Sequence, residues 1–239
     1  EQFARATNPD DPAQAEIIKL KERAIRDLGL APTASPAMGT AFSGGAVGSD
    51  TYWREQGKKY GLEVQDFLPE NMTEEMMDAA APHEAMARSQ MGKNPSRSAQ
   101  VEKLIHRNYF QIKNADAVFA VGKLERGPGL RVQGGTGYAV QMGLNKGIPV
   151  YVYDQKTKTW FTGDQNNRQE IAAPRLTSSP ALIGTRDLSD AGRNAIQNVY
   201  RDTFGDKTKV SLNQEAAFDK WLDDTIAQTQ ATSQKGLED

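Results

Sequence analysis

Residues 40–61 read TAFSGGAVGSDTYWREQGKKYG, which joins a short apolar run, a glycine-rich turn and a helical pattern. The apolar run up to Ser43 predicts a strand, and the pattern from Asp50 to Tyr60 predicts a helix that Gly61 ends. The order strand, glycine turn, helix is typical of the first unit of an α/β fold with a parallel sheet. We therefore expect the core of the protein to begin with this unit.

Strand and helix patterns alternate beyond this unit. Further strands are predicted at Leu62–Phe67, Ala117–Val121, Ile148–Tyr153 and Ala181–Gly184, with a hairpin at Trp160 and Phe161. Further helices are predicted at Asn71–Ala81, from Ser96 through Ile112, at Tyr138–Lys146, at Ser189–Phe204 and at Asn213–Ala227, whereas residues 82–95 look irregular. The alternation predicts a Rossmann-like three-layer parallel sheet with helices on both faces. We expect an N-terminal helical arm and linker (1–38), this core (39–188) and a C-terminal helical extension with a polar tail (189–239).

The composition argues against several classes of protein. Lys and Arg number 29 and Asp and Glu 31, so no strong net charge draws the chain to nucleic acid or to an anionic membrane. The absence of cysteine excludes disulfides, thiolate catalysis and Cys-ligated zinc. The two histidines, His83 and His106, are not spaced as a metal-ligand pair. No apolar run has the length of a membrane span, so we expect a cytoplasmic protein.

Two glycine-rich loops are the main candidates for a binding site. The first lies between a strand and a helix, and the second comes just before another helix. Glycine lets a backbone approach a ligand closely, and the free N–H groups of a helix start donate to phosphate oxygens. Parallel strands direct both loops to the edge of the sheet where α/β folds bind ligands. The predicted contacts are Ser43, Gly44, Gly45, Gly48, Ser49 and Asp50 in the first loop and Gly134, Gly135, Thr136 and Gly137 in the second.

Neither loop carries a known nucleotide motif. No Gly-Lys-Ser/Thr sequence follows the glycines as in a P-loop, and the glycine spacing differs from the dinucleotide fingerprint G-x-G-x-x-G. ATP hydrolysis and hydride transfer are therefore not expected. We predict a pocket for a phosphate-bearing nucleotide or nucleotide derivative, with no additional cofactor and no metal.

Four segments carry a resemblance to a known family. In chain order they are AFSGGAVGSD (41–50), Arg107-Asn108 followed by ADAVFAVG (115–122), GGTG (134–137) and PVYV (149–152). They resemble the SLOG superfamily, a Rossmann-like group that includes cytokinin-activating LOG phosphoribohydrolases, the DNA-processing protein DprA and predicted molybdenum-carrier-like proteins. The resemblance covers about half of the chain and implies a nucleotide-binding domain. It adds Arg107, Asn108, Gly122, Tyr138 and Gln141 to the predicted ligand contacts.

The resemblance also bears on catalysis. In LOG-type enzymes the second loop looks like Gly-Gly-x-Gly-Thr-x-x-Glu, and its glutamate acts with an upstream arginine to cleave an N-glycosidic bond. Here Gln141 stands at the glutamate position and Tyr138 at the threonine position. An amide cannot act as a carboxylate base, which favours binding over hydrolysis. In a hydrolase, Asp50 or Asp116 would replace the glutamate while Arg107 holds the phosphate.

Other residues near the loops have two interpretations. The run KNPSRS (93–98) forms either a basic wall of the site or a solvated loop. Tyr52, Trp53 and Tyr138 either stack on a base or pack in the core. Asp154, at the end of a predicted strand, either belongs to the site or stabilises a turn.

Three functions remain open from the sequence. The first is a module that senses or sequesters a nucleotide or a nucleotide-derived signal, such as an ADP-ribose-like or cyclic nucleotide, in conflict between bacteria and phages. The second is a nucleotide N-glycosidase or phosphoribohydrolase. The third is a scaffold whose outer helices mediate assembly, and a homo-oligomer is expected from the resemblance.

Overall fold

The computed structural model describes residues 38–205 together with Lys220. Of the N-terminal arm and linker predicted at 1–38, the structure describes only Met38. The helix predicted at 213–227 lies outside the described residues except for Lys220. The described residues 38–205 lie in one compact unit. The helix after Ser189, which the sequence assigned to a C-terminal extension, therefore belongs to the same unit as the core.

Helices and strands alternate along most of this unit, as the sequence predicts. The helices are α2 (Ser49–Lys59), α3 (Glu74–Gln90), α4 (Ala99–Lys113), α5 (Gly134–Lys146) and α6 (Asp190–Phe204), with a short 3-10 helix η1 (Pro69–Asn71). The strands are β1 (Ala41–Ser43), β2 (Val64–Asp66), β3 (Ala117–Gly122), β4 (Val150–Asp154), β5 (Thr159–Gly163), β6 (Arg168–Ile171) and β7 (Pro180–Gly184).

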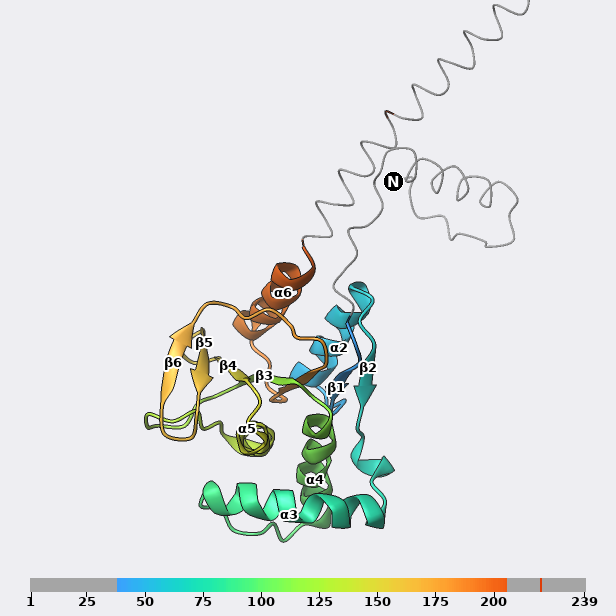
Figure 1. Cartoon of the computed structure of the whole chain (residues 1–239), viewed down its shortest axis with the longest axis vertical. Coiled ribbons are helices and arrows are strands. Elements are labelled where there is room, and N and C mark those ends of the chain that lie inside the picture. Colours follow the sequence, from blue (N-terminus) through green and yellow to red (C-terminus); the bar gives the residue numbers. More distant parts are fainter. Residues whose placement is uncertain (1–37, 206–219, 221–239) are drawn as a thin grey trace, which may run out of the picture. The chain divides into compact units, whose positions relative to one another are not determined.

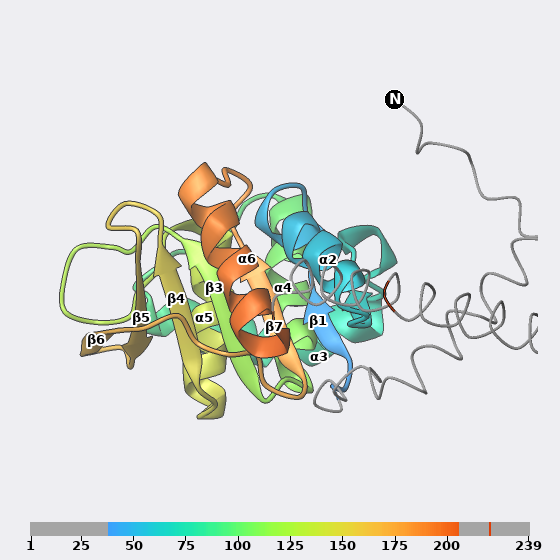
Figure 2. The same ribbon diagram turned by 90° about the horizontal axis from the view of Figure 1, so that it is seen from above.

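The strands form one seven-stranded sheet in the order β2-β1-β7-β3-β4-β5-β6. Figure 2 shows this order from β6 to β1. All pairs from β2 to β4 are parallel. Strand β7, the last strand among the described residues, lies between β1 and β3, because Ala181 is in register with Phe42 on one side and with Val118 on the other.

The far edge of the otherwise parallel sheet is antiparallel. Strand β5 pairs antiparallel with both β4 and β6, and the β5–β6 pair is the hairpin predicted at Trp160 and Phe161. A short turn joins β4 to β5, and Lys158 in that turn has a φ of 60°. Such a turn is far too short for the crossover that a parallel pair requires, so β5 has to run antiparallel to β4.

Helices cover both faces of the sheet and make a Rossmann-like three-layer α/β fold (Figure 1). Alternate strand residues point to opposite faces. Val118 and Ala120 pack with α4 and α5, whereas Phe119 and Val121 pack with α2 and α6. Helix α3 lies across α4 and α5 on the side away from the sheet (Figure 1).

The ends of three helices differ from the predictions. Helix α3 continues through Pro82 to Gln90, where an irregular segment was expected. Helix α4 begins after Ser98, whose hydroxyl accepts a hydrogen bond from the Val101 amide, rather than at Ser96. Helix α5 begins at Gly134, so the second glycine-rich segment forms the first turn of a helix instead of a loop before it.

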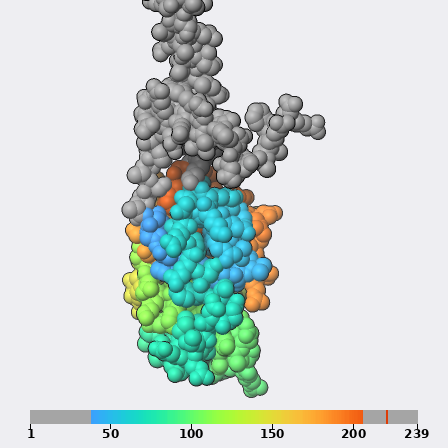
Figure 3. Space-filling model, turned by 90° about the vertical axis from the view of Figure 1, so that its right-hand side faces the viewer, coloured from blue at the N-terminus to red at the C-terminus, as the bar shows by residue number. Residues whose placement is uncertain are grey.

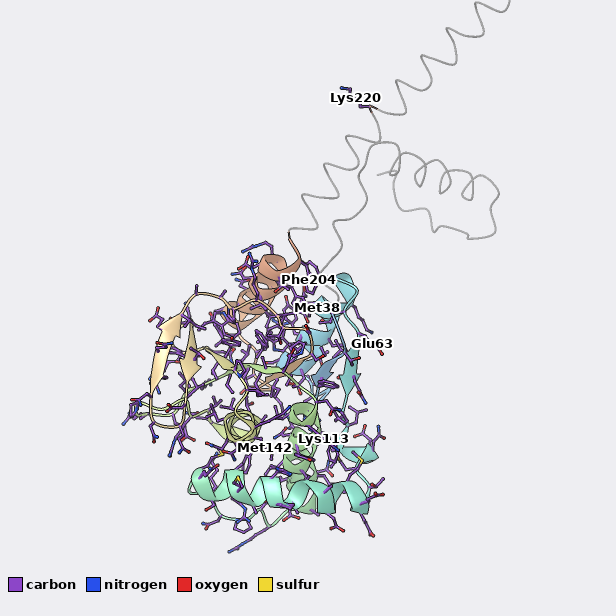
Figure 4. All side chains as sticks on the ribbon, in the orientation of Figure 1. Met38, Glu63, Lys113, Met142, Phe204 and Lys220 are labelled. Carbon is purple, nitrogen blue, oxygen red and sulfur yellow. The ribbon has the colours of Figure 1, made fainter. Side chains whose placement is uncertain are left out.

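The helix layer of α2 and α6 contains an aromatic core. Trp53 and Tyr200 are fully buried, and the Tyr200 hydroxyl donates a hydrogen bond of 2.8 Å to the Trp53 carbonyl. Met38 and Phe204 pack against the same apolar cluster and lie near each other in Figure 4. The two ends of the continuous described segment therefore lie close together. Figure 3 shows the neighbouring β2 edge, where residues of α2, β2 and α3 form much of the visible surface.

Candidate functional site

A cleft of about 710 Å³ lies at the carboxyl ends of β1, β7 and β3. Five segments line it: the loop after β1, the segment between α3 and α4, one face of α4, the first turn of α5 and the loop after β7. This is the edge at which open α/β sheets bind ligands. The two predicted loops therefore contribute to one cleft, although β7 lies between the strands that carry them.

The first turn of α5 presents backbone donors to the cleft. Gly134, Gly135 and Thr136 all line it. N–H groups in the first turn of a helix have no acceptor within the helix, and Gln133 at the N-cap makes no side-chain capping bond. A Cβ placed on Gly135 would meet no atom within 4 Å. The turn is thus open on its ligand side and carries the partial positive charge of a helix N-terminus.

Two amides of the first glycine-rich loop are already paired within the fold. The amide of Gly45 donates to the Ser43 hydroxyl at 3.4 Å, and that of Ser49 to the Thr185 carbonyl at 3.0 Å. The hydroxyl of Ser49 also donates to the Thr185 carbonyl, at 2.9 Å. A Cβ on Gly48, where φ is 107°, would lie 2.3 Å from the Arg186 carbonyl oxygen. The glycine and serine residues here serve close packing between the loops after β1 and β7 and do not line the cleft, so their role as phosphate contacts stays a prediction.

Asp50 and Arg107 face each other at the inner end of the cleft. Asp50 lies in the first turn of α2, and its Oδ1 accepts a 2.9 Å bond from the Gly184 amide. The Arg107 Nη1 donates to the Gly44 carbonyl and, at 3.4 Å, to the Phe67 carbonyl. Nη2 of Arg107 lies 3.9 Å from Oδ2 of Asp50, and its buried Nε has no partner among the described residues. Two backbone carbonyls therefore hold the guanidinium in place, while its Nε has no hydrogen-bond partner among the described residues.

Burial changes the ionisation of both groups. The loss of hydration raises the pKa of Asp50 from 3.8 to about 6, although Arg107 and the amides of Ala46 and Gly184 oppose the shift. Burial also lowers the pKa of Arg107, which still remains charged near neutrality. A carboxyl group that titrates near pH 6 beside a cationic guanidinium can hold or release a proton under mild conditions.

Asn108 connects α4 to the first turn of α5. Its Nδ2 donates to the Gly135 carbonyl at 3.2 Å, and its Oδ1 accepts from Gln111 Nε2 at 3.4 Å. Because Arg107 contacts the loop after β1, the two adjacent side chains fix α4 between both glycine-rich segments. Both line the cleft, as predicted.

Three further predicted contacts lie outside the cleft. Gly122 and Gly137 pack closely on Val132, and a Cβ on Gly137 would lie 2.1 Å from the Val132 carbonyl oxygen. Gln141 is one helical turn beyond Gly137, and its amide donates to Gln90 and to Asn145 at 3.2 and 3.1 Å. Gln141 therefore joins α5 to α3 and does not contact the cleft.

Asp116 lies at the opposite edge of the sheet. It immediately precedes β3, and its carboxylate accepts bonds from the Thr177 hydroxyl and, at 3.0 Å, from the Ser179 amide. The cleft lies at the other end of β3, so Asp116 cannot act there as a catalytic residue. Asp154, by contrast, stabilises turns: it accepts from the amides of Leu124 at 3.1 Å and Thr157 at 3.3 Å.

The three aromatic residues predicted to stack on a base lie in different environments. Tyr138 lines the cleft, and Lys93 Nζ lies 5.3 Å from the centre of its ring. Trp53 is fully buried in the core, and the Tyr52 hydroxyl accepts a 2.6 Å bond from Gln197 on α6. Of the predicted stacking residues, Tyr138 alone reaches the cleft.

Two parts of the cleft come from outside the predicted site. Arg186 and Asp187 line it from the loop after β7, which sequence reasoning did not select. A polar run directly after the apolar strand was the available signal. Lys93, Asn94 and Ser96 also line the cleft, which supports the interpretation of this segment as a wall of the site.

The described residues match neither the pattern expected of a metal site nor that of a membrane-spanning helix. No group of three or more His, Cys, Asp or Glu side chains is placed to hold a metal ion among these residues. None of the described helices is both long and apolar enough to cross a bilayer. No protein-family model, curated protein or solved structure matches the chain.

Proposed function

We propose that the cleft binds a phosphate-bearing nucleotide or nucleotide-derived signal. The observation that carries this proposal is the pairing of open first-turn amides in α5 with the Arg107 guanidinium in one cleft. Backbone amides at a helix start and a planar guanidinium are both suited to phosphate oxygens. The resemblance to the SLOG superfamily supports the same class of ligand.

The charge of the lining favours an anion. Lys93, Arg107 and Arg186 contribute three positive charges, and Asp50 and Asp187 contribute two negative charges when both are ionised. Because Asp50 has a pKa of about 6, protonation on ligand binding would remove one of those negative charges. An anion is then held locally, although the chain carries a formal net charge of −2.

A sensing or sequestering role follows from the scarcity of catalytic groups. Gln141 and Asp116, two of the three candidate catalytic residues, lie outside the cleft. A protein that binds a nucleotide signal without turning it over fits a role in conflict between bacteria and phages, as the resemblance implies. Its location in the cytoplasm and its assembly as a homo-oligomer stay predictions.

The binding proposal is tested by calorimetry with inorganic phosphate, nucleoside monophosphates, ADP-ribose and cyclic ADP-ribose isomers. We expect Arg107→Gln to weaken the binding of the tightest of these at least tenfold, because a charge-assisted hydrogen bond is lost (about 1.5–3 kcal/mol). Arg201→Gln, which removes a half-exposed charge on α6, serves as the control and should bind normally. The proposal fails if the wild-type protein binds none of these compounds.

One observation favours N-glycosidic cleavage as a second candidate. Asp50 lies in the cleft, and its pKa of about 6 allows it to be protonated near neutrality. In a hydrolysis, water adds to the ribose C1′, the bond from C1′ to the base breaks, and Asp50 donates a proton to the departing base. The proton that the attacking water loses then restores the protonated Asp50. Chromatography of nucleoside monophosphates and NAD after incubation distinguishes the two functions. Free base that Asp50→Asn abolishes would establish the enzyme, and ligand recovered intact would establish the binder.

A further inference from the structure

One face of α4 changes from apolar to polar as it enters the cleft. Val101, Leu104, Ile105 and Asn108 follow the i, i+3, i+4, i+7 spacing of a single helical face, and all four line the cleft. Asn108, with Arg107 beside it, reaches the glycine-rich segments. Val101 lies seven residues earlier, which corresponds to about 10 Å along the helix. This face of α4 is therefore polar at its inner end, beside Arg107, and apolar at its outer end.

Val101 is unusual because it is a large apolar side chain left accessible inside a cleft. It is 41% exposed, and only Val47 and Met86 among the described large hydrophobic residues are more exposed. Core packing does not account for this exposure. Leu104, one turn further along α4, is also only partly buried and faces the same cleft. Together they offer a small apolar surface that a ligand can cover.

The Val101 amide and the Ser96 hydroxyl at the outer end of α4 are already paired within the protein. The hydroxyl of Ser98 caps the helix by accepting from the Val101 amide at 3.4 Å, so this amide is already paired. The Ser96 hydroxyl is likewise engaged with the backbone of Ser98. A group bound here gains from apolar contact rather than from charge.

We propose that Val101 and Leu104 form the wall on which the base of the bound nucleotide lies, while its phosphate contacts Arg107 and the first turn of α5. This inference rests on the proposed nucleotide-binding function and adds the orientation of the ligand. The separation of the two ends of the cleft is comparable with the length of a nucleoside monophosphate. The base is the flat, largely apolar part of such a ligand, so it fits the outer end, and the doubly charged phosphate fits the inner end.

The test compares three probes that share a phosphate: inorganic phosphate, ribose 5-phosphate, and the tighter-binding of adenosine and uridine 5′-monophosphate. Calorimetry is carried out on the full chain and on Val101→Ser and Leu104→Ser, with Met86→Ser as a control for an exposed apolar residue outside the cleft. We expect each cleft variant to weaken nucleotide binding about tenfold. Binding of ribose 5-phosphate should change less than about twofold, because that probe has no base to lie on the wall.

The outcomes separate this inference from the proposed function. Equal weakening of nucleotide and ribose 5-phosphate, or no weakening of either, overturns the base-binding wall while phosphate binding in the cleft stands. If the wild-type protein binds no phosphorylated probe, the proposed function fails and the wall fails with it. Val101 is well exposed, so Val101→Ser is expected to fold, and a thermal melt of each variant verifies this.

Discussion

Burial sets the charge of Asp50, because only 3% of the residue is accessible. Its carboxyl group accepts bonds from two backbone amides and lies 3.9 Å from Arg107, yet the loss of hydration outweighs these contacts and raises its pKa to about 6. The folded protein therefore binds a proton at Asp50 more tightly than the unfolded chain does. The stability that this proton contributes is present below the unfolded pKa of 3.8 and is lost as the pH rises through 6.

This linkage predicts the behaviour of Asp50→Asn. Asparagine resembles the protonated carboxyl group, so the variant should be more stable than the wild type at pH 8 by about 1–3 kcal/mol. The difference should shrink toward pH 4, where Asp50 is protonated in the folded state. Urea denaturation at several pH values measures this dependence.

An exposed acid provides the control for the pH series. Asp78 is exposed on α3, and Asp78→Asn should leave the free energy of unfolding nearly unchanged at both pH values. A wild-type stability that shows the same pH dependence as the Asp50→Asn variant would contradict the argument from burial.

Within α5, neighbouring glycines serve different purposes. A Cβ on Gly135 points into open space at the cleft, whereas a Cβ on Gly137 would collide with the Val132 backbone. The first glycine leaves room for a ligand, and the second allows the helix to pack on the chain that precedes it. The same helix thus carries a functional and a structural glycine two residues apart.

We predict that Gly135→Glu abolishes phosphate binding without loss of stability. The added carboxylate lies in the first turn of α5, where it competes with an anion and interacts favourably with the helix dipole. A thermal melt should be unchanged or slightly raised, and calorimetry with the tightest-binding phosphate compound should show no heat of binding.

Gly137→Ala supplies the contrast. We expect it to destabilise the protein by about 1–3 kcal/mol, because the extra methyl group must displace the Val132 carbonyl. Gly135→Ala should be neutral or stabilising by comparison. If both alanine variants are equally stable, the assignment of separate roles to the two glycines is mistaken.

At the scale of the described fold, strand β7 completes the centre of the sheet. Strand β7 pairs with both β1 and β3 and is buried over most of its length. Strands β2 and β6 occupy the two edges, and their residues are only partly buried or exposed. The pairing of β1 and β3 within one sheet therefore depends on a segment that follows both strands by many residues.

Hydrogen exchange should reflect this arrangement. We expect the backbone amides of β3 and β7 to exchange slowest and those of β2 and β6 fastest, because protection follows burial and pairing on both sides. Mass spectrometry of peptic fragments from the full chain measures the order. Exchange in β7 as fast as in β6 would show that the centre of the sheet opens independently of its neighbours.

Local patterns in the amino-acid sequence were enough to predict much of this fold. The predicted strands at β1, β3, β4 and β7, the hairpin at β5 and β6, and the bounds of α2 and α6 to within one residue follow from periodicity, glycine positions and short turns. Of the predicted site residues, Asp50, Arg107, Asn108, Gly134, Gly135, Thr136 and Tyr138 line one cleft. These are the residues for which position along a strand or helix already determines the edge of the sheet that they reach.

The amino-acid sequence by itself determined where most strands and helices lie and at which edge of the sheet the candidate site was expected. Tertiary structure alone decided that β7 lies between β1 and β3 and that Arg186 lines the cleft. It also decided that the Thr185 carbonyl accepts the hydrogen bond of the Ser49 amide. Spacing along a chain reports on neighbours within a few residues. The choice of partners over 130 residues apart depends on which backbone and side-chain groups remain unpaired once the sheet has closed.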